Sequence, residues 1–464
     1  MTKQIAISLL LLFITSYLIS GQADFEIKQK YFSKDELIAD LSYLKNKLET
    51  THPSLYLYNS SFIIQAAFDS LAQSLSKPQT ELEFYKSITI LSSIIKDGHT
   101  LLLPSIKSTE YHDRNSLFLP FHFVILNNQL YVDQLCTMNN SIPIGSEVLS
   151  INDIPTNEII KQLTDRQVRD GNNQTYPLWI ISTYFREYFS YIFGHPENYK
   201  ISYKIDEKLN TVLINGLSKD SIFFYRNQRY PDKVFYKIPK DGIKLKLFEE
   251  KKFALLTIKD FHNSVLKNEY KQNFKKVISS YFDQLKKSKA DNLIIDIRNN
   301  QGGDIENAVF LLSYLLDKPF AVVQGYLTIK NGQLCKCSGP SMGIHKIKSN
   351  NFHGKLYVLI NGGSFSNSGI VSSCLQANNR AIFIGQESGG NPDIISGFVK
   401  ELSLPKTKIR LQLPTKQFRI TTKQKIDGHG VLPNIVMIPK LEDIIENIDT
   451  ELNMTIDIIV RSSR

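Results

Sequence analysis

The sequence predicts a multidomain α/β protein, and three observations support this fold class. The chain has 464 residues, of which 42% are hydrophobic and 22% charged, so it can fill more than one core. Apolar residues recur at helical spacing over residues 30–104. Strand-like and helix-like segments then alternate over residues 251–445, which is the pattern of a layered α/β core.

The charge balance excludes one broad class of partner. Lys and Arg together number 55 and Asp and Glu 45, a formal net charge of +10. The excess is spread along the chain without a dense basic run, so we do not expect nucleic-acid binding. Beyond the first residues, no apolar stretch is long enough to span a bilayer, so we expect no stable membrane insertion of the mature protein.

Residues 1–23 have the layout of a cleaved signal peptide. Lys3 precedes an apolar run over residues 5–19, and small residues follow at Ser20, Gly21 and Ala23. We therefore expect a secreted or periplasmic protein. A retained membrane anchor is the weaker interpretation, because the run is short and lacks a cationic flank.

The four cysteines do not form a framework. Cys335 and Cys337 make a Cys-x-Cys pair with no second pair or histidine cluster nearby, while Cys136 and Cys374 stand apart. A tetrahedral zinc site is therefore not expected. We predict that the protein needs no metal and no organic cofactor.

Residues 30–104 are predicted to form a helical domain. Ser33 and Glu36 have the spacing of a capping box before the first apolar-periodic helix. The helical pattern ends at the turn-like sequence DGHT, residues 97–100, and a short strand is expected over residues 101–103.

Residues 115–165 read as a compact β-rich module that ends in a brief helix from Thr156. Residues 166–250 are an uncertain linker or insert, with a helical aromatic-rich stretch at 176–193 and a strand-like piece at 208–214.

Residues 251–445 have the most regular pattern, and residues 446–464 are expected to form a tail helix. The core strands are expected at 253–258, 292–297, 356–360 and 381–385, with helices near 267–287, at 305–316 and around Ile370.

Two Gly-rich turns, at Gly302-Gly303 and Gly362-Gly363, each follow a predicted strand and precede a predicted helix. Only the second turn is followed by serines, as in a nucleophile elbow, where a tight turn presents a serine at a helix start beside free N–H groups. An ordinary turn with a helix-capping serine is the simpler interpretation. Neither turn continues as a phosphate-binding loop, since no Gly-Lys-Ser or Gly-Lys-Thr follows.

Five short motifs resemble those of the tail-specific, or C-terminal processing, serine peptidases, including the tricorn and retinoid-binding-protein-like branches. The motifs are DGHT at 97–100, IDIRNNQGG at 295–303, VLINGGSFSNSG at 358–369, IGQESGG at 384–390 and GHGVLPN at 428–434. The resemblance implies a core with the crotonase-like ββα superhelix fold. It also implies a PDZ-like module at 115–165, because GSEVLSIND at 145–153 is similar to part of that module.

The resemblance implies that Ser366 is the nucleophile, with Ser364 and Ser368 as local competitors. It places the oxyanion hole at the N–H of Asn367 and at one N–H of Gly302 or Gly303. Two rigid donors of this kind stabilise a tetrahedral oxyanion by a few kcal/mol.

The expected base is a histidine and not a lysine. Asn391 stands where Ser-Lys members of the family carry lysine, whereas His99 in DGHT matches the histidine of the tricorn-like branch. The third member would be Asp427, although the family usually has the longer Glu there. Glu387 is the alternative carboxylate, and His429 is the alternative base.

The sequence thus predicts an exported serine endopeptidase of the C-terminal processing type. It would hydrolyse peptides or unfolded proteins through an acyl-enzyme. The alternative is a non-catalytic exported protein that binds peptides or apolar ligands on the same scaffold. A crotonase-like acyl-CoA enzyme suits the core but neither the signal peptide nor the serine elbow. The sequence makes no prediction of oligomeric state.

Overall fold

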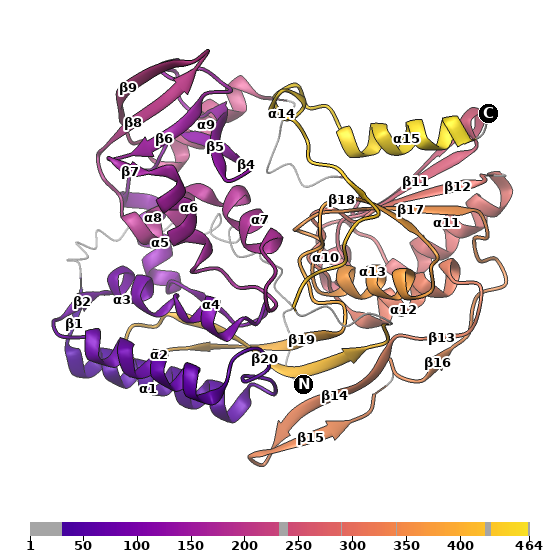
Figure 1. Ribbon diagram of the computed structural model, residues 1–464, viewed down its shortest axis with the longest axis horizontal. Helices are drawn as coiled ribbons and strands as arrows, with labels where there is room; N and C mark the ends of the chain where they lie inside the picture. Colours follow the sequence, from indigo (N-terminus) through magenta and orange to yellow (C-terminus); the bar gives the residue numbers. More distant parts are fainter. Residues whose placement is uncertain (1–29, 232–239, 289, 340, 423–427, 463–464) are drawn as a thin grey trace.

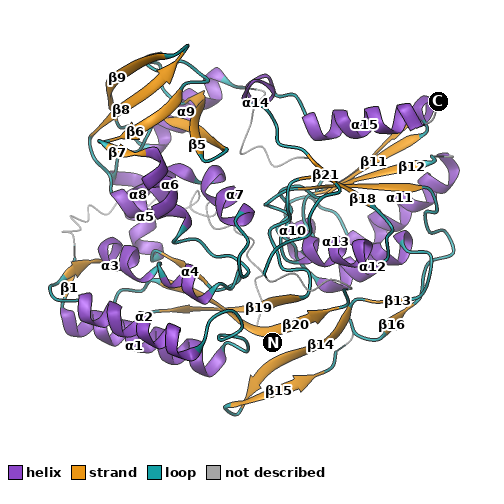
Figure 2. Cartoon of the chain, viewed as in Figure 1, coloured by secondary structure: helices purple, strands orange, loops and turns teal. Residues whose placement is uncertain are grey.

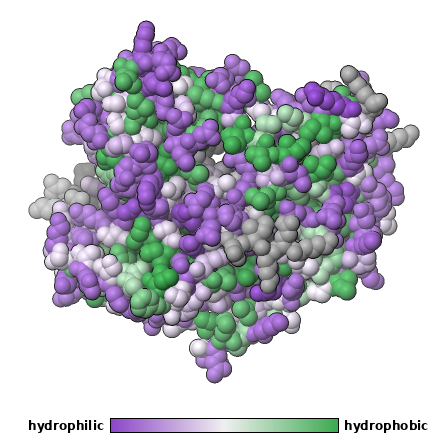
Figure 3. Space-filling view, viewed as in Figure 1, coloured by the Kyte–Doolittle hydropathy of each residue, from purple (hydrophilic) through white to green (hydrophobic). Residues whose placement is uncertain are grey.

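A computed structural model describes residues 30–231, 240–288, 290–339, 341–422 and 428–462. The predicted signal peptide and Asp427 lie outside these described residues. The chain forms a helical N-terminal region, a β-rich module and a C-terminal α/β core (Figure 1). Within the described ranges, no helix is both long and apolar enough to cross a membrane. Figure 3 shows polar and apolar residues interspersed over one face of the molecule.

The N-terminal region begins with the predicted capping box. The Ser33 side chain accepts a hydrogen bond from the N–H of Glu36, and the Glu36 side chain accepts one from the N–H of Ser33. The elements of this region are β1 (Tyr31–Phe32), α1 (Lys34–Thr51), α2 (Ser61–Ser74), β2 (Gln79–Thr80), α3 (Glu81–Ile88) and α4 (Leu91–Ile95). The predicted short strand is present as β3 (Leu101–Leu103), directly after the DGHT turn.

The module is a largely antiparallel sheet in the order β4-β5-β6-β8-β9, with β7 paired to β6. Two of its strands come from the segment whose structure the sequence left uncertain, so the sheet extends beyond residue 165. The module strands are β4 (Phe121–Leu126), β5 (Gln129–Leu135), β6 (Glu147–Ile151), β7 (Ile154–Pro155), β8 (Asn198–Ile205) and β9 (Lys208–Asn215). The helices around this sheet are α5 (Ile106–Asn115), α6 (Thr156–Thr164), α7 (Thr175–Thr183), α8 (Phe185–Phe193) and α9 (Lys219–Arg229).

The C-terminal core is built on a sheet in the order β10-β11-β12-β17-β18-β21. β10 runs antiparallel to β11, and the remaining pairs are parallel. These strands are β10 (Ile243–Phe248), β11 (Phe253–Ile258), β12 (Asn292–Asp296), β17 (Lys355–Ile360), β18 (Ile382–Gly385) and β21 (Ile435–Val436). The mixed α/β prediction is therefore confirmed.

Helices cover both faces of this sheet, so its strands are apolar on both sides. Leu293 and Ile295 of β12 pack into the cluster that includes residues of α11 to α13, whereas Ile294 packs with Ile459 on the opposite face. The helices are α10 (Asn263–Asn268), α11 (Phe274–Ser288), α12 (Ile305–Leu315), α13 (Asn367–Ala377), α14 (Leu441–Glu446) and α15 (Thr450–Ser462), and a 3₁₀ turn, η2, spans Glu249–Lys251. Figure 2 shows strands of this sheet between α15 and the helices α12 and α13.

The prediction of a single helix near 267–287 is wrong at its N-terminal end. The chain forms the short α10, then a turn in which Lys271 has a φ of +55°, and only then α11. Gln272 lies in this turn and makes two hydrogen bonds with the backbone of Ile243, at 2.8 and 2.9 Å. The side chain thus ties the turn to β10, and this tertiary contact interrupts a locally helical pattern.

A second sheet of the C-terminal region joins the two ends of the chain. β20 pairs with β14 and β19, and β3 of the N-terminal region pairs with its first residues, so that Leu102 lies opposite Leu411. β3 follows the DGHT turn directly, so this ladder brings residues near position 100 to the core. The strands are β14 (Val323–Lys330), β15 (Gln333–Cys337), β19 (Ile394–Ser403) and β20 (Arg410–Ile420), and a separate pair is formed by β13 (Phe320–Ala321) and β16 (Ile344–His345).

Candidate active site

Ser366 lies at the turn between β17 and α13. It is the N-cap residue of α13 and has a φ of +54° and a ψ of −113°, a backbone conformation that residues other than glycine rarely adopt. A serine held in this way at a strand-to-helix turn presents its hydroxyl outward, as in a nucleophile elbow. The two nearby serines that compete with Ser366 as candidate nucleophiles, Ser364 and Ser368, are both fully buried. The Ser364 hydroxyl donates to the carbonyl of Ile297 at 2.8 Å.

The glycines before Ser366 are required by close packing. An ideal Cβ at Gly362 would lie 2.3 Å from the carbonyl oxygen of Thr175, and one at Gly363 would lie 2.4 Å from the Trp179 ring. Both contacts come from α7, which belongs to the segment that the sequence left uncertain. The turn therefore fits against α7 only without side chains at these two positions.

His99 faces Ser366 across the interface between the two ends of the chain. The distance from His99 Nε2 to Ser366 Oγ is 3.0 Å, within hydrogen-bonding range for a base and its nucleophile. The imidazole packs on the ring of Phe365, with ring centroids 4.6 Å apart. The side chains of His99 and Ser366, 267 positions apart in sequence, are thus brought into direct contact.

The environment of His99 keeps its ring neutral. Burial lowers the pKa of His99 to about 4, although the charge of Asp97 opposes this shift. The imidazole is therefore unprotonated at neutral pH and has a lone pair available for a proton. An imidazole that accepts the proton at Nε2 carries its own hydrogen on Nδ1, and that group needs an acceptor.

No described residue supplies this acceptor. Among the described residues, His99 Nδ1 is buried without a hydrogen-bond partner. Glu387 is engaged elsewhere, since its Oε1 accepts from the N–H of Gly430 at 2.7 Å and from Asn173 Nδ2 at 2.9 Å. His429 Nδ1 lies 3.3 Å from the same Glu387 oxygen. In the described part of the chain, neither alternative residue contacts His99 or Ser366.

The predicted third member, Asp427, lies outside the described residues, but the next residue in the chain is close to the site. The Gly428 carbonyl accepts hydrogen bonds from the N–H groups of Asn172 and Asn173, at 3.2 and 3.0 Å. The adjacent Gly171 donates to the carbonyl of Lys96, in the loop that carries His99. Residue 428 is therefore linked to the His99 loop through a single intervening loop.

A second histidine, His52, contacts two residues of the DGHT turn. His52 accepts the N–H of Ser54 at Nδ1, and its Nε2 lies 3.1 Å from Thr100 Oγ1 and 3.5 Å from Asp97 Oδ2. Burial favours a higher pKa for Asp97, but its interactions with His52 and His99 hold that pKa below the ordinary value. The Asp97 carboxylate also accepts the N–H of His99 at 2.9 Å. Asp97 and His52 therefore fix the backbone of the turn.

The two glycines that could contribute to the oxyanion hole differ in whether their backbone N–H group is free to donate. The N–H of Gly302 donates to Asn300 Oδ1 at 2.9 Å, so it is already satisfied. Among the described residues, the N–H groups of Gly303 and Asn367 have no protein acceptor. An ideal Cβ at Gly302 would lie 2.6 Å from the Asn367 nitrogen, so the two turns are in direct contact. The geometry therefore favours Asn367 and Gly303 as the donor pair.

Several contacts of the site come from residues that sequence reasoning did not identify. Asp170 accepts hydrogen bonds from the N–H of Gly98 at 2.8 Å and from the N–H of Asn391 at 3.1 Å. Tyr176 stacks on Phe365 with centroids 4.1 Å apart, and Trp179 donates to Asn299 at 2.7 Å. These residues lie in the segment 166–250, where neither a motif nor a regular period marked them.

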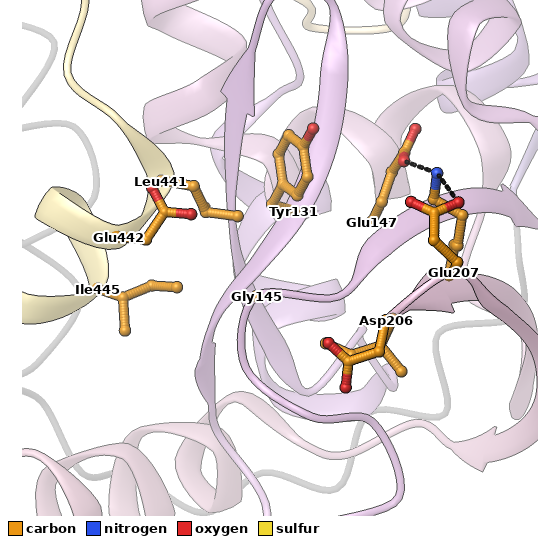
Figure 4. Close-up of a pocket in the computed structure, with 10 residues that line it drawn as sticks. Tyr131, Gly145, Glu147, Asp206, Glu207, Leu441, Glu442 and Ile445 are labelled. Carbon is orange, nitrogen blue, oxygen red and sulfur yellow. Dashed lines mark hydrogen bonds and ion pairs between the residues drawn. The ribbon is translucent and has the colours of Figure 1, made fainter.

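A cavity of about 400 Å³ lies elsewhere, between the module and α14 (Figure 4). Its lining includes Tyr131, Glu147 and Glu207 of the module and Glu442 and Ile445 of α14. Among the described residues, none of those predicted for catalysis lines it.

Comparison with known proteins shows what the core is similar to. Residues 252–437 match the model of peptidase family S41. The matched segment includes Ser366 and both glycine turns but not His99. A carboxyl-terminal-processing protease of Picosynechococcus sp. is 24% identical over 170 residues. The alignment covers 37% of this chain, and the chain spans only 37% of that relative's length.

Solved structures extend the likeness to most of the chain. The crystal structure of mature CPAF has a TM-score of 0.67 at 13% identity, covering 92% of this chain and 97% of that one. A structure of mature CPAF complexed with lactacystin has the same TM-score and identity over 93% of this chain and 98% of that one. At this identity the likeness concerns the fold. Together the matches show that residues 252–437 are similar to peptidase family S41 and that the fold of most of the chain is similar to that of CPAF.

Proposed function

We propose that this protein is an exported serine peptidase that hydrolyses peptide bonds through an acyl-enzyme, with Ser366 as nucleophile and His99 as general base. The 3.0 Å contact between His99 Nε2 and Ser366 Oγ is the observation that carries the proposal. The predicted signal peptide, residues 1–23, supports export, and the match to family S41 supports a peptide or protein substrate.

In the first step, Ser366 Oγ attacks the carbonyl carbon of the scissile peptide bond while His99 Nε2 takes the hydroxyl proton. The carbonyl oxygen becomes an oxyanion, which the N–H groups of Asn367 and Gly303 stabilise. The tetrahedral intermediate collapses as His99 gives the proton to the leaving amine. Water then attacks the acyl carbon while His99 accepts its proton. The second tetrahedral intermediate collapses as the bond to Ser366 Oγ breaks, His99 returns the proton to Oγ, and the carboxylic acid product leaves.

Asp427 is the proposed third member, because a carboxylate on His99 Nδ1 would hold the tautomer that accepts the serine proton. The unpartnered Nδ1 and the anchored position of Gly428 support this role. Glu387 is disfavoured because its Oε1 is already engaged by Asn173, His429 and Gly430.

A fluorophosphonate probe that reacts with activated serines tests the proposal. We expect labelling of the wild-type protein, none in Ser366→Ala, and a rate reduced about 10²- to 10⁴-fold in His99→Ala. Ser368→Ala is the matched control, because the buried hydroxyl of Ser368, on the same helix, makes no hydrogen bond with any described residue, so this variant should label normally.

Labelling that survives in Ser366→Ala would exclude Ser366 as the nucleophile. A folded wild-type protein that does not label, yet binds peptides or apolar ligands, would instead favour the non-catalytic binding protein.

A further inference from the structure

Asp170 is a buried carboxyl group for which the proposed mechanism has no role. It lies in the loop between α6 and α7, and only 3% of its surface is exposed. Burial, together with the charge of Asp97, raises the pKa of Asp170 to about 7. A buried carboxyl group is costly to the fold, so its position calls for a compensating role.

The two oxygens of Asp170 join the two halves of the candidate site. Oδ1 accepts the N–H of Gly98, the residue before His99, at 2.8 Å. Oδ2 accepts the N–H of Asn391 at 3.1 Å. Asn391 follows Gly390, and an ideal Cβ at Gly390 would lie 3.3 Å from the Ser366 nitrogen. One carboxyl group thus contacts both the loop that carries the base and the loop packed behind the nucleophile.

The residues after Asp170 bind the same loops. Gly171 donates to the carbonyl of Lys96, two residues before Gly98. Asn173 Nδ2 donates to Glu387 Oε1 and to the carbonyl of Ser388, at 2.9 and 2.8 Å. The loop at 170–173 therefore makes direct hydrogen bonds with the His99 loop, with the 387–391 loop and with Gly428.

We propose that Asp170 is a positioning residue for the peptidase reaction. Its carboxyl oxygens hold the His99 loop and the 387–391 loop at the spacing that puts His99 Nε2 on the Ser366 hydroxyl. The inference rests on the proposed function, because positioning matters only if His99 and Ser366 react together.

Asp170→Asn tests this role with little change in shape. The asparagine keeps one acceptor oxygen, but its NH₂ group is a donor and faces a backbone N–H. The two loops should move apart slightly, and a misplacement of about 1 Å costs on the order of 10²-fold in rate. We expect the fluorophosphonate labelling rate and the kcat for a peptide to fall about 10- to 100-fold, with KM changed by less than about threefold.

Asp40→Asn is the matched control. Asp40 is also fully buried, and its oxygens accept the N–H groups of Lys406 and Thr407, each at 2.7 Å, in a loop that contains none of the site residues. Urea denaturation should show that both variants are destabilised. Only Asp170→Asn should lose kcat, and a wild-type kcat in that variant would overturn the proposal.

Hydrogen–deuterium exchange separates this inference from the proposed function. Asp170→Asn should speed exchange in residues 96–100 and 388–392, whereas Asp40→Asn should speed it only in residues 404–409. Unchanged exchange in both site segments would overturn the positioning role. If the wild-type protein does not label at all, the peptidase proposal fails, and the exchange result still decides whether Asp170 holds the two loops.

Discussion

Ser366 combines a rarely populated backbone conformation with a hydroxyl that meets an imidazole. A non-glycine residue held at positive φ costs of order 1–3 kcal/mol, and such strain persists only where the surrounding structure enforces it. Here the tight contacts of Gly362 and Gly363 with α7 enforce it. The strained backbone presents one hydroxyl group. Strain of this kind is common at functional sites.

Two groups with shifted pKa values predict a two-step pH profile for the labelling of Ser366. His99 has a pKa of about 4, so the base stays unprotonated well below pH 6.5 and is lost only near pH 4. Asp170 has a pKa of about 7, and its protonation puts a hydroxyl hydrogen against a backbone N–H. We expect a partial fall in rate near pH 7 and a complete loss near pH 4.

The other titratable groups that face Asp170 do not account for the fall in labelling rate near pH 7. They are Asp97, whose pKa is lowered, and Tyr58 and Tyr176, whose pKa values are raised by burial. None of these three groups titrates near neutrality. Asp170→Asn should therefore remove the upper step and keep the lower one. A single step at pH 6.5 in both proteins would contradict this assignment.

Gly302 offers a test of the oxyanion hole. In Gly302→Ala, the new methyl group would lie 2.6 Å from the Asn367 nitrogen, at a φ of +102° that alanine disfavours. Blocking that donor should slow labelling about 10²- to 10³-fold. Gly332→Ala is the control, because Gly332 also has positive φ, at +75°, but nothing within 4 Å of its Cβ position. Equal labelling rates in the two variants would exclude Asn367 as a donor.

Sequence reasoning named His99 and Ser366, whose side chains lie in contact, but missed the residues that hold them in place. His99 and Ser366 lie in short motifs whose residue types suggest chemistry on their own. Asp170 and Asn173 lie in the polar run 169–173, which has the composition of an ordinary loop. Asp170 accepts backbone N–H groups of distant segments and Asn173 donates to oxygens of a distant segment, and no local pattern encodes such contacts.

At the scale of elements, the C-terminal core follows closely from the pattern of the sequence. β11 spans the predicted residues 253–258, and β12, β17, α12 and β18 agree with prediction to within one residue at each end. These strands are buried on both faces, so their apolar runs are unambiguous. Residues 166–250 were harder to interpret, because the aromatic residues of α7 and α8 obscure the helical period.

α15 is joined to the core by a partly buried cation. Arg298, just after β12, binds Asp296, Asp449 and Glu451, with contacts of 2.8 to 3.1 Å. In Arg298→Met the three carboxylates lose their shared partner, so the free energy of unfolding should fall by about 3–5 kcal/mol in urea denaturation.

Lys200→Met is the control for this prediction. Lys200 pairs with Asp153 at 2.7 Å, but both side chains are at least half exposed, so the loss should be below about 1 kcal/mol. Equal losses in the two variants would show that Arg298 does not anchor α15.

At the scale of the whole molecule, the candidate site lies where the two ends of the chain meet. The β3–β20 ladder and the stack of His99, Phe365 and Tyr176 both cross this junction. The sequence alone could not show that His99 reaches Ser366, because that contact depends on how whole regions pack. The segment that matches the family model, residues 252–437, likewise does not include His99.

Substitutions of Tyr176 test directly whether packing at this junction stabilises the protein. The Tyr176 ring is 1% exposed and stacks on Phe365, so Tyr176→Ala should lower the free energy of unfolding by about 3–5 kcal/mol and slow the labelling of Ser366. Tyr176→Phe keeps the stack and loses only a 3.4 Å hydrogen bond to Gln301, so it should cost about 1 kcal/mol and label normally. A Tyr176→Ala protein with wild-type stability would contradict this view of the junction.

The structure of the protein after reaction with a fluorophosphonate tests the central claim most directly. We predict a phosphonyl group bonded to Ser366 Oγ, its oxygen about 3 Å from the nitrogens of Asn367 and Gly303, with His99 Nε2 still beside Oγ. An adduct on another residue, or a phosphonylated Ser366 with His99 turned away from it, would contradict the account.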